Sequence, residues 1–295
     1  MNSRRGYFLS SNALPHNVDN ADIHKKYGSK IMWKTWITVF GIAFVFITNA
    51  LGAAVVFFFK KDIPSKLNRF LLGFASGVMI AASVWSLLLP SIEQSERLLG
   101  GWAFLPACVG ILLGGVFLTG LDRLAPYFMQ NGKNGNIDGR GAWRSWWRLF
   151  SAVTLHNVPE GLAVGFAFGA AARSGSAPAF LSALGLAIGI GIQNFPEGAA
   201  VALPVKSACG SNRKAFLWGA ASGVAEPIFA IIGYFLAASL ALAQPWLLAF
   251  AAGAMLFVAA EDLIPEARSE ESPSLGAWGV LLGFVVMMSL DVLFG

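Results

Sequence analysis

Eight long apolar segments constrain the fold of this 295-residue chain more than any other feature. Each is about 20 residues long, which is the length that a helix needs to cross a bilayer. The segments cover residues 36–59, 70–90, 103–124, 149–172, 178–204, 215–239, 246–266 and 276–294. Only 13% of the residues are charged, which is about half the share in an average soluble protein. The sequence therefore predicts an all-α polytopic membrane protein with eight transmembrane helices.

The polar segments predict how the chain is divided and oriented. Residues 1–35 read as a polar tail, residues 36–295 as a single eight-helix transmembrane domain, and residues 125–147 as a flexible cytoplasmic loop. Thirteen of the 21 Lys and Arg residues fall on one side of the predicted membrane. The positive-inside rule places that side in the cytoplasm and both termini outside. The net charge of +5 is thus explained by topology, and no nucleic-acid partner is expected.

Three pairs of segments resemble each other. Residues 73–80 in the second span resemble residues 249–256 in the seventh, and residues 112–122 in the third resemble residues 281–291 in the eighth. The fourth and fifth spans share a polar cluster. With eight spans, the two members of each pair run in opposite directions. We therefore expect inverted repeats, with spans 1–3 and 6–8 arranged around the central pair, and a substrate site at the midplane between them.

The shared polar cluster reads HNVPEG at residues 156–161 and QNFPEG at residues 193–198. Each copy puts a carboxylate, Glu160 or Glu197, near the middle of an apolar span, and Glu226 lies near the middle of the sixth span. A charged side chain at that depth costs at least about 2.5 kcal/mol. Three carboxylates at one depth on consecutive helices therefore indicate a site for something cationic.

The types of side chain in these clusters indicate a metal. The candidate ligands are His156, Asn157, Glu160, Gln193, Asn194, Glu197 and Glu226. Imidazole, carboxylate and amide groups suit a divalent first-row metal, with Zn²⁺ first and Cd²⁺, Mn²⁺ and Fe²⁺ as alternatives. The prolines after Val158 and Phe195 remove backbone donors, which frees carbonyl oxygens and makes room for a ligand. The metal is expected to be the transported substrate, and no organic cofactor is expected.

These two clusters, together with Glu226-Pro227, resemble the ZIP (Zrt/Irt-like) metal transporters, and the QNFPEG form is similar to their GufA-like branch. The resemblance covers roughly residues 36–295. It implies eight helices with both termini outside, and divalent metal moving into the cytoplasm. It also implies a transporter rather than an enzyme, in an integral membrane location. Compact loops suit a bacterial cytoplasmic membrane, and an organellar membrane is left open.

The resemblance further implies a binuclear centre between the fourth, fifth and sixth spans. Its first metal position takes His156, Glu160, Gln193 and Glu197. Its second takes Asn157, Glu160, Asn194, Glu197 and Glu226, so that two carboxylates bridge. Many family members have Asp where this chain has Asn194, which weakens the second position. The cytoplasmic loop after the third span has no His here, although it is often His-rich in the family.

Other acids lie towards the ends of the predicted spans. Glu93 and Asp291 are expected at the outer side, as stations where metal enters. Asp122, Glu261 and Asp262 are expected at the cytoplasmic side, as stations where it leaves. The alternative is that such acids are simply solvated or paired, for example Asp122 with Arg123.

Two other functions stay open at this point. A membrane-embedded zinc hydrolase would need three protein ligands and an activated water, often with several His. Only His156 lies in a span, and the chain contains no His-Glu-x-x-His motif. A proton-coupled carrier of another cation, or a passive metal channel, fits the same buried acids. The lipid bilayer and divalent metal ions are the expected partners, and a homodimer is left open.

Overall fold

The computed structural model describes residues 20–58, 64–129, 140–268 and 273–294, and every regular element in these ranges is helical. Within them, the side chains of residues 20–31, 122, 124–129, 140–149, 152, 208 and 273 are outside the described part. The chain separates into two units, residues 1–36 and residues 37–295, and the second unit holds the candidate site residues. Most of the predicted tail, and residues 130–139 of the predicted loop, lie outside the described residues.

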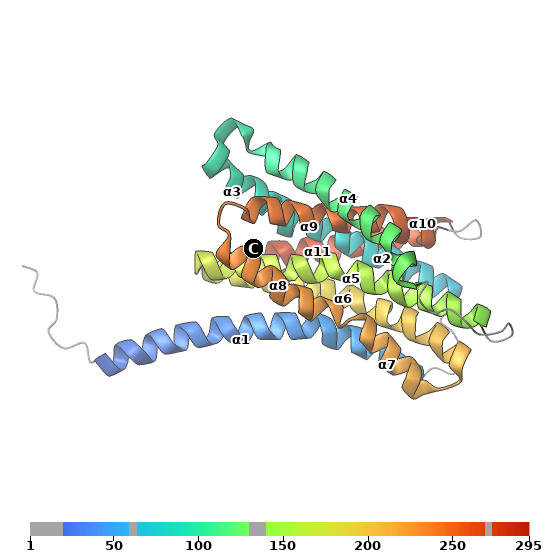
Figure 1. Ribbon diagram of the computed structural model, residues 1–295. Helices are drawn as coiled ribbons and strands as arrows, with labels where there is room; N and C mark the ends of the chain where they lie inside the picture. The colour runs from blue at the N-terminus through green and yellow to red at the C-terminus, as the bar shows by residue number, and fades with distance from the viewer. Residues whose placement is uncertain (1–19, 59–63, 130–139, 269–272, 295) are drawn as a thin grey trace, which may run out of the picture. The chain divides into compact units, whose positions relative to one another are not determined.

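The helices of Figure 1 succeed one another along the chain with short connections. The first half contains α1 (Asn20–Ala53), η1 (Ala54–Phe57), α2 (Ser65–Ala82), η2 (Ser83–Leu88), α3 (Leu89–Leu99), η3 (Gly100–Trp102) and α4 (Phe104–Met129). The second half contains α5 (Arg140–Ser174), α6 (Ala177–Cys209), α7 (Asn212–Ser222), α8 (Ala225–Ser239), α9 (Gln244–Val258), η4 (Ala259–Leu263), α10 (Ile264–Ala267) and α11 (Pro273–Phe294).

Seven helical segments of the described chain are long and apolar enough to cross a membrane. They are Met32–Phe57, Ser65–Trp102, Phe104–Leu121, Ala177–Ser207, Asn212–Ser239, Gln244–Ala267 and Ser274–Phe294. This confirms the class, an all-helical polytopic membrane protein. The predicted fourth span, residues 149–172, is not among the seven. It lies in α5, whose apolar run is interrupted by the polar cluster at 156–160. The prediction of eight spans therefore stays a prediction.

Two predicted spans differ from simple α-helices. The second is longer than expected, because α2 passes through the π-helical η2 into α3. The seventh likewise contains the π-helical η4. Ser83 begins η2 ten residues after Gly73, and Ala259 begins η4 ten residues after Ala249. The two π segments thus occupy equivalent places in the two matched stretches of sequence.

The helices of residues 37–295 pack in two groups. In the first, α2 packs along α11 and α4 packs along α9, as Figure 1 shows. In the second, α5 packs along α8 and α6 packs along α7. The groups meet where α9 contacts α5 and where α2 and α11 contact α6. We call the end where α2 begins and α10 ends the inner end, because its loops carry the charges predicted to be cytoplasmic. The outer end is the one where α3 ends and α9 begins.

Candidate metal centre

Helices α5 and α6 bring the two polar clusters together inside the second group. Glu160 of α5 is 1% exposed and Gln193 of α6 is 0% exposed. The Gln193 Nε2 atom donates a hydrogen bond of 2.6 Å to Glu160 Oε1. Both helices run unbroken through Pro159 and Pro196, so the loss of a backbone donor at each proline does not end either helix.

Helix α8 contributes the third carboxylate. The sixth span was predicted as one helix, but it breaks at Gly223 and Val224, between α7 and α8. Glu226 lies in the first turn of α8 and is 0% exposed. Pro227 comes next, and proline is tolerated in a first turn because the N–H there has no helical partner. Asn194 Nδ2 donates a hydrogen bond of 2.6 Å to Glu226 Oε2.

Two further contacts complete the surroundings. Asn157 Nδ2 donates a hydrogen bond of 2.9 Å to the carbonyl oxygen of Ser222, the last residue of α7. Asn49 of α1 is 0% exposed, and its Nδ2 donates a 3.0 Å hydrogen bond to the Gly219 carbonyl oxygen. We did not predict a role for Asn49 from the sequence. Its signal was a single amide in an otherwise apolar span.

Each amide and each carboxylate of the predicted site leaves one oxygen free. Six buried oxygens have no hydrogen-bond donor among the described residues: Asn157 Oδ1, Glu160 Oε2, Gln193 Oε1, Asn194 Oδ1, Glu197 Oε2 and Glu226 Oε1. Buried polar atoms in proteins nearly always have a partner. Since the unpaired atoms are all acceptors, the group that they lack is a donor or a cation.

The three carboxylates also act on one another. Glu160 is within electrostatic range of Glu197 and Glu226, and Glu226 is within range of Glu197. Like charges in a poorly hydrated interior repel strongly. In the described part of the chain, however, no three His, Cys, Asp or Glu side chains form a ready cage for a metal ion. A bound cation would therefore also use amide oxygens, or it would draw the acidic side chains together.

The glycine after each central glutamate allows a neighbouring helix to come close. A Cβ atom at Gly161 would overlap the Glu226 carbonyl oxygen of α8, and one at Gly198 would overlap the Asn49 carbonyl oxygen of α1. These approaches bring α8 against α5 and α1 against α6. The two glycines thus explain how the centre is assembled from helices that are distant in sequence.

His156 lies at the edge of this centre, towards the inner end. It is within electrostatic range of Glu197, and its Nε2 atom is 3.2 Å from Asp262 Oδ2. His156, Glu197, Asp262 and Glu266 share the lining of a cavity of about 450 Å³ between the two helix groups. The cavity continues to Ser65 at the start of α2 and therefore reaches the inner end.

The other predicted acids are dispersed. Asp291 of α11 is buried and accepts a hydrogen bond from the Ser86 hydroxyl of η2, while its second oxygen has no hydrogen-bond partner among the described residues. Glu93 on α3 and Glu261 in η4 are exposed, and the structure brings neither into the centre. The side chain of Asp122 lies outside the described part of the chain. Of the two predicted exit acids whose side chains are described, Glu261 and Asp262, only Asp262 has a contact with a residue of the predicted centre, His156.

These features define an all-helical polytopic membrane protein with a buried, oxygen-rich and acidic centre between its helices. A family model described as ZIP Zinc transporter matches residues 139–291. The chain therefore belongs to the ZIP family, whose members are transporters and not enzymes.

Individual relatives match over most of the chain. It is 37% identical to zinc transporter ZIP11 of Xenopus tropicalis, over 83% of this chain and 93% of that protein. It is 37% identical to zinc transporter GufA of Myxococcus xanthus, over 84% of this chain and 94% of that protein. It is 33% identical to zinc transporter ZIPB of Bordetella bronchiseptica, over 87% and 81%. The similarity to GufA supports the predicted GufA-like branch.

Proposed function

We propose that this protein moves divalent metal, with a preference for Zn²⁺, into the cytoplasm through the centre between α5, α6 and α8. The observation that carries the proposal is the set of six buried oxygens that have no hydrogen-bond donor in the described part of the chain. Hydrated Zn²⁺ must exchange its water ligands for protein atoms in order to pass, and oxygen and imidazole ligands suit it. The named relatives are zinc transporters from a vertebrate and from bacteria, which supports the same substrate.

The centre would hold metal in two positions. The first uses His156, Glu160, Gln193 and Glu197, and the second uses Asn157, Glu160, Asn194, Glu197 and Glu226. In this proposal the amides of Gln193 and Asn194 have two tasks. Their NH₂ groups hold Glu160 and Glu226 in place, and their oxygens face the metal. Zinc is the transported substrate, and Cd²⁺, Mn²⁺ and Fe²⁺ are competing substrates for the same ligands.

We also infer eight spans, with α5 as the fourth, arranged as inverted repeats. Helix α5 has 35 residues, and a helix of about 20 already crosses the hydrocarbon core. Three observations support the repeat. The π segments η2 and η4 occupy equivalent positions. The packing of α2 on α11 is mirrored by that of α9 on α4. The approach of α5 to α8 at Gly161 is mirrored by that of α6 to α1 at Gly198.

The route is a consequence of this arrangement. Metal would enter past Glu93 and Asp291, rest in the centre, and leave through the inner cavity past Asp262. Glu197 lines that cavity, which supports our inference that the centre opens towards the inner end. Movement of one helix group against the other would expose the centre alternately to each side, as in other transporters with inverted repeats. A bacterial cytoplasmic membrane, termini outside and a homodimer stay predictions.

Zinc uptake by cells tests the proposal. A zinc-starved bacterial host should accumulate zinc when it carries the wild-type protein. Uptake should fall about tenfold or more in the double variant that combines Glu160→Gln with Glu197→Gln, because a loss of about 1.4 kcal/mol in zinc binding already costs a factor of ten in affinity. Glu96→Gln, which neutralises an exposed carboxylate on α3, is the matched control and should transport normally. Unchanged uptake by the double variant at equal membrane abundance would refute the proposal.

A further inference from the structure

A second cavity lies between the two helix groups at the outer end. It has a volume of about 500 Å³ and is lined by residues of η2, α3, α5, α6 and α9. None of the seven predicted metal ligands lines it, and none of its lining residues is acidic. Its charged lining consists of Arg97 from α3 and Arg173 from the last turn of α5. This lining offers a dication no acidic ligand, so the cavity does not suit the metal as a resting place.

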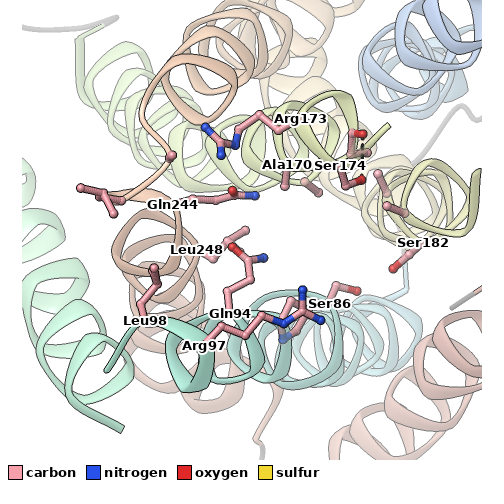
Figure 2. A pocket seen from close by; sticks show the side chains of 17 residues that line it. Ser86, Gln94, Arg97, Leu98, Ala170, Arg173, Ser174, Ser182, Gln244 and Leu248 are labelled. Atoms are coloured by element: carbon pink, nitrogen blue, oxygen red, sulfur yellow. Dashed lines mark hydrogen bonds between the residues drawn. The ribbon is translucent and has the colours of Figure 1, made fainter. Parts of the chain in front are cut away.

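The two arginines are unusual in their position along the sequence. Eight Lys and Arg residues fall on the predicted outer side, and six of them belong to residues 1–35. The remaining two are Arg97 and Arg173, and both line this one cavity. Figure 2 shows them on opposite sides of it, on α3 and α5. Membrane proteins tend to keep basic residues out of short outer loops, so their convergence at one place suggests a shared task.

Neither guanidinium has an ion pair or a hydrogen bond with another described residue. Glu93 lies one helical turn before Arg97, and Glu96 directly precedes Arg97. Neither acid lines the cavity, and neither forms an ion pair with Arg97 in the described part of the chain. Both arginines are exposed at this cavity, so water solvates their guanidinium groups and screens their charges until an anion takes its place. Guanidinium groups bind carboxylate and phosphate oxygens through two parallel hydrogen bonds.

A buried amide strengthens this picture. Gln244 is 7% exposed, lines the same cavity and, like Arg97 and Arg173, makes no side-chain hydrogen bond within the described chain. Its amide group is directed into the cavity beside Arg173, with Gln94 facing it from α3 (Figure 2). Gln244 is also the first residue of α9. Its backbone N–H already donates to the Ala241 carbonyl oxygen and Pro245 has no N–H, so the donors offered to the cavity here come from side chains. Several unpaired donors from three helices therefore converge on one space.

We propose that this outer cavity is a binding site for a small oxyanion with carboxylate or phosphate groups, which bridges Arg97 and Arg173 with help from Gln94 and Gln244. Its source is either a soluble anion or the phosphate of a lipid headgroup. Arg97 lies on α3, which packs against α9 of the first helix group, and Arg173 lies on α5 of the second. The anion therefore ties the two groups together at the outer end. A consequence that rests on the proposed function is that the bound anion favours the state closed to the outside.

Binding is tested on the purified full-length protein in an uncharged detergent, after removal of metal. Under these conditions citrate cannot act by chelating zinc, and the outcome does not depend on whether the protein transports. Citrate or inorganic phosphate at saturation should raise the thermal unfolding temperature by about 2–4 °C or more, compared with chloride at equal ionic strength. This rise in unfolding temperature should vanish in the double variant that combines Arg97→Gln with Arg173→Gln. Arg213→Gln, an exposed arginine on α7, should keep it.

Two further arms separate the source of the anion and the role of geometry. The first arm uses dioctanoyl phosphatidylglycerol. The site binds a lipid headgroup if this lipid stabilises the wild type but not the double variant, while citrate and phosphate have no effect. Arg97→Lys keeps the charge but loses the two-pronged geometry, and it should weaken citrate or phosphate binding about tenfold by calorimetry. The proposal is overturned when none of the three anions stabilises the wild type, or when the double variant responds equally.

Discussion

Individual residues decide how the centre balances its charges. Gln193 and Asn194 are neighbours on α6, and the turn of about 100° between successive helical residues directs one towards α5 and the other towards α8. Gln193 accordingly donates to Glu160, and Asn194 donates to Glu226. Each amide therefore supports one carboxylate without adding charge. An acid at either position could not make the same bond, so replacing Asn194 tests how the amide functions.

Asn194→Asp should destabilise the metal-free protein and strengthen its response to zinc. Without metal, the variant loses a buried hydrogen bond, which costs about 1–3 kcal/mol, and places a second carboxylate against Glu226. With zinc, the new carboxylate becomes a ligand. The thermal unfolding temperature should therefore be lower than that of the wild type in EDTA, and should rise further on adding zinc. Asn212→Asp, at the start of α7, should behave like the wild type. Equal zinc-induced shifts in Asn194→Asp and the wild type would contradict this role.

Helix elements determine whether the residues of the centre can meet. Helix α8 approaches α5 at Gly161, and α1 approaches α6 at Gly198, where no Cβ atom fits. Small residues allow such close packing in membranes, where lipid is as apolar as the helix faces and the hydrophobic effect adds little. The break between α7 and α8 then places Glu226 at a helix start, facing Asn194. Close packing of α8 on α5, together with the break before α8, thus brings the third carboxylate, Glu226, into the centre.

Gly161→Ala and Gly198→Ala should each destabilise the protein and lower zinc uptake. An added methyl group must push a backbone carbonyl of α8 or α1 aside, and such overpacking costs about 1–3 kcal/mol. Gly120→Ala is the matched control, because nothing lies within 4 Å of an added Cβ atom there, and alanine favours a helix by about 1 kcal/mol over glycine. Thermal unfolding in detergent should separate the three variants. Wild-type stability in both Gly161→Ala and Gly198→Ala would mean that α8 and α1 pack less closely than described.

At the scale of the whole molecule, the two helix groups enclose a cavity at each end. The inner cavity has Glu197 in its lining and ends at Ser65, whereas the outer one contains Arg97 and Arg173 and none of the predicted metal ligands. Of these two cavities, only the inner one is lined by predicted metal ligands. This asymmetry is what a transporter needs if it is to release metal without leaving an open pore.

Labelling of introduced cysteines should reveal this asymmetry in a variant that lacks Cys108 and Cys209. Ala200→Cys, in the inner cavity, should react with a membrane-impermeant thiol reagent in inside-out vesicles and not in intact cells. Leu242→Cys, an exposed position at the outer end, should show the opposite pattern and serves as the control. Reaction of Ala200→Cys from outside the cell, with Leu242→Cys protected, would reverse the proposed orientation.

The class of protein and the residues of the candidate centre could be read from the sequence. Insertion of a helix into a bilayer depends mainly on the summed transfer free energies of its own residues. The apolar segments therefore predicted an all-helical membrane protein, which the structure confirms. The repeated Pro-Glu-Gly clusters were equally readable, because a carboxylate is costly in an apolar span whatever its neighbours are. The motifs were also sufficient to identify the ZIP family.

Only the tertiary structure decided which groups meet. The pairing of Asn194 with Glu226, the place of Asn49, and the break before α8 depend on contacts between residues that are distant in sequence. The same holds for Arg97 and Arg173, which are 76 positions apart in the chain and share one cavity. Hydrogen bonding and charge repulsion act over a few ångströms in space, and sequence patterns do not carry that proximity. The tendency of a segment to form a membrane helix thus depends on its own residues, whereas the contacts of that helix depend on how the whole bundle packs.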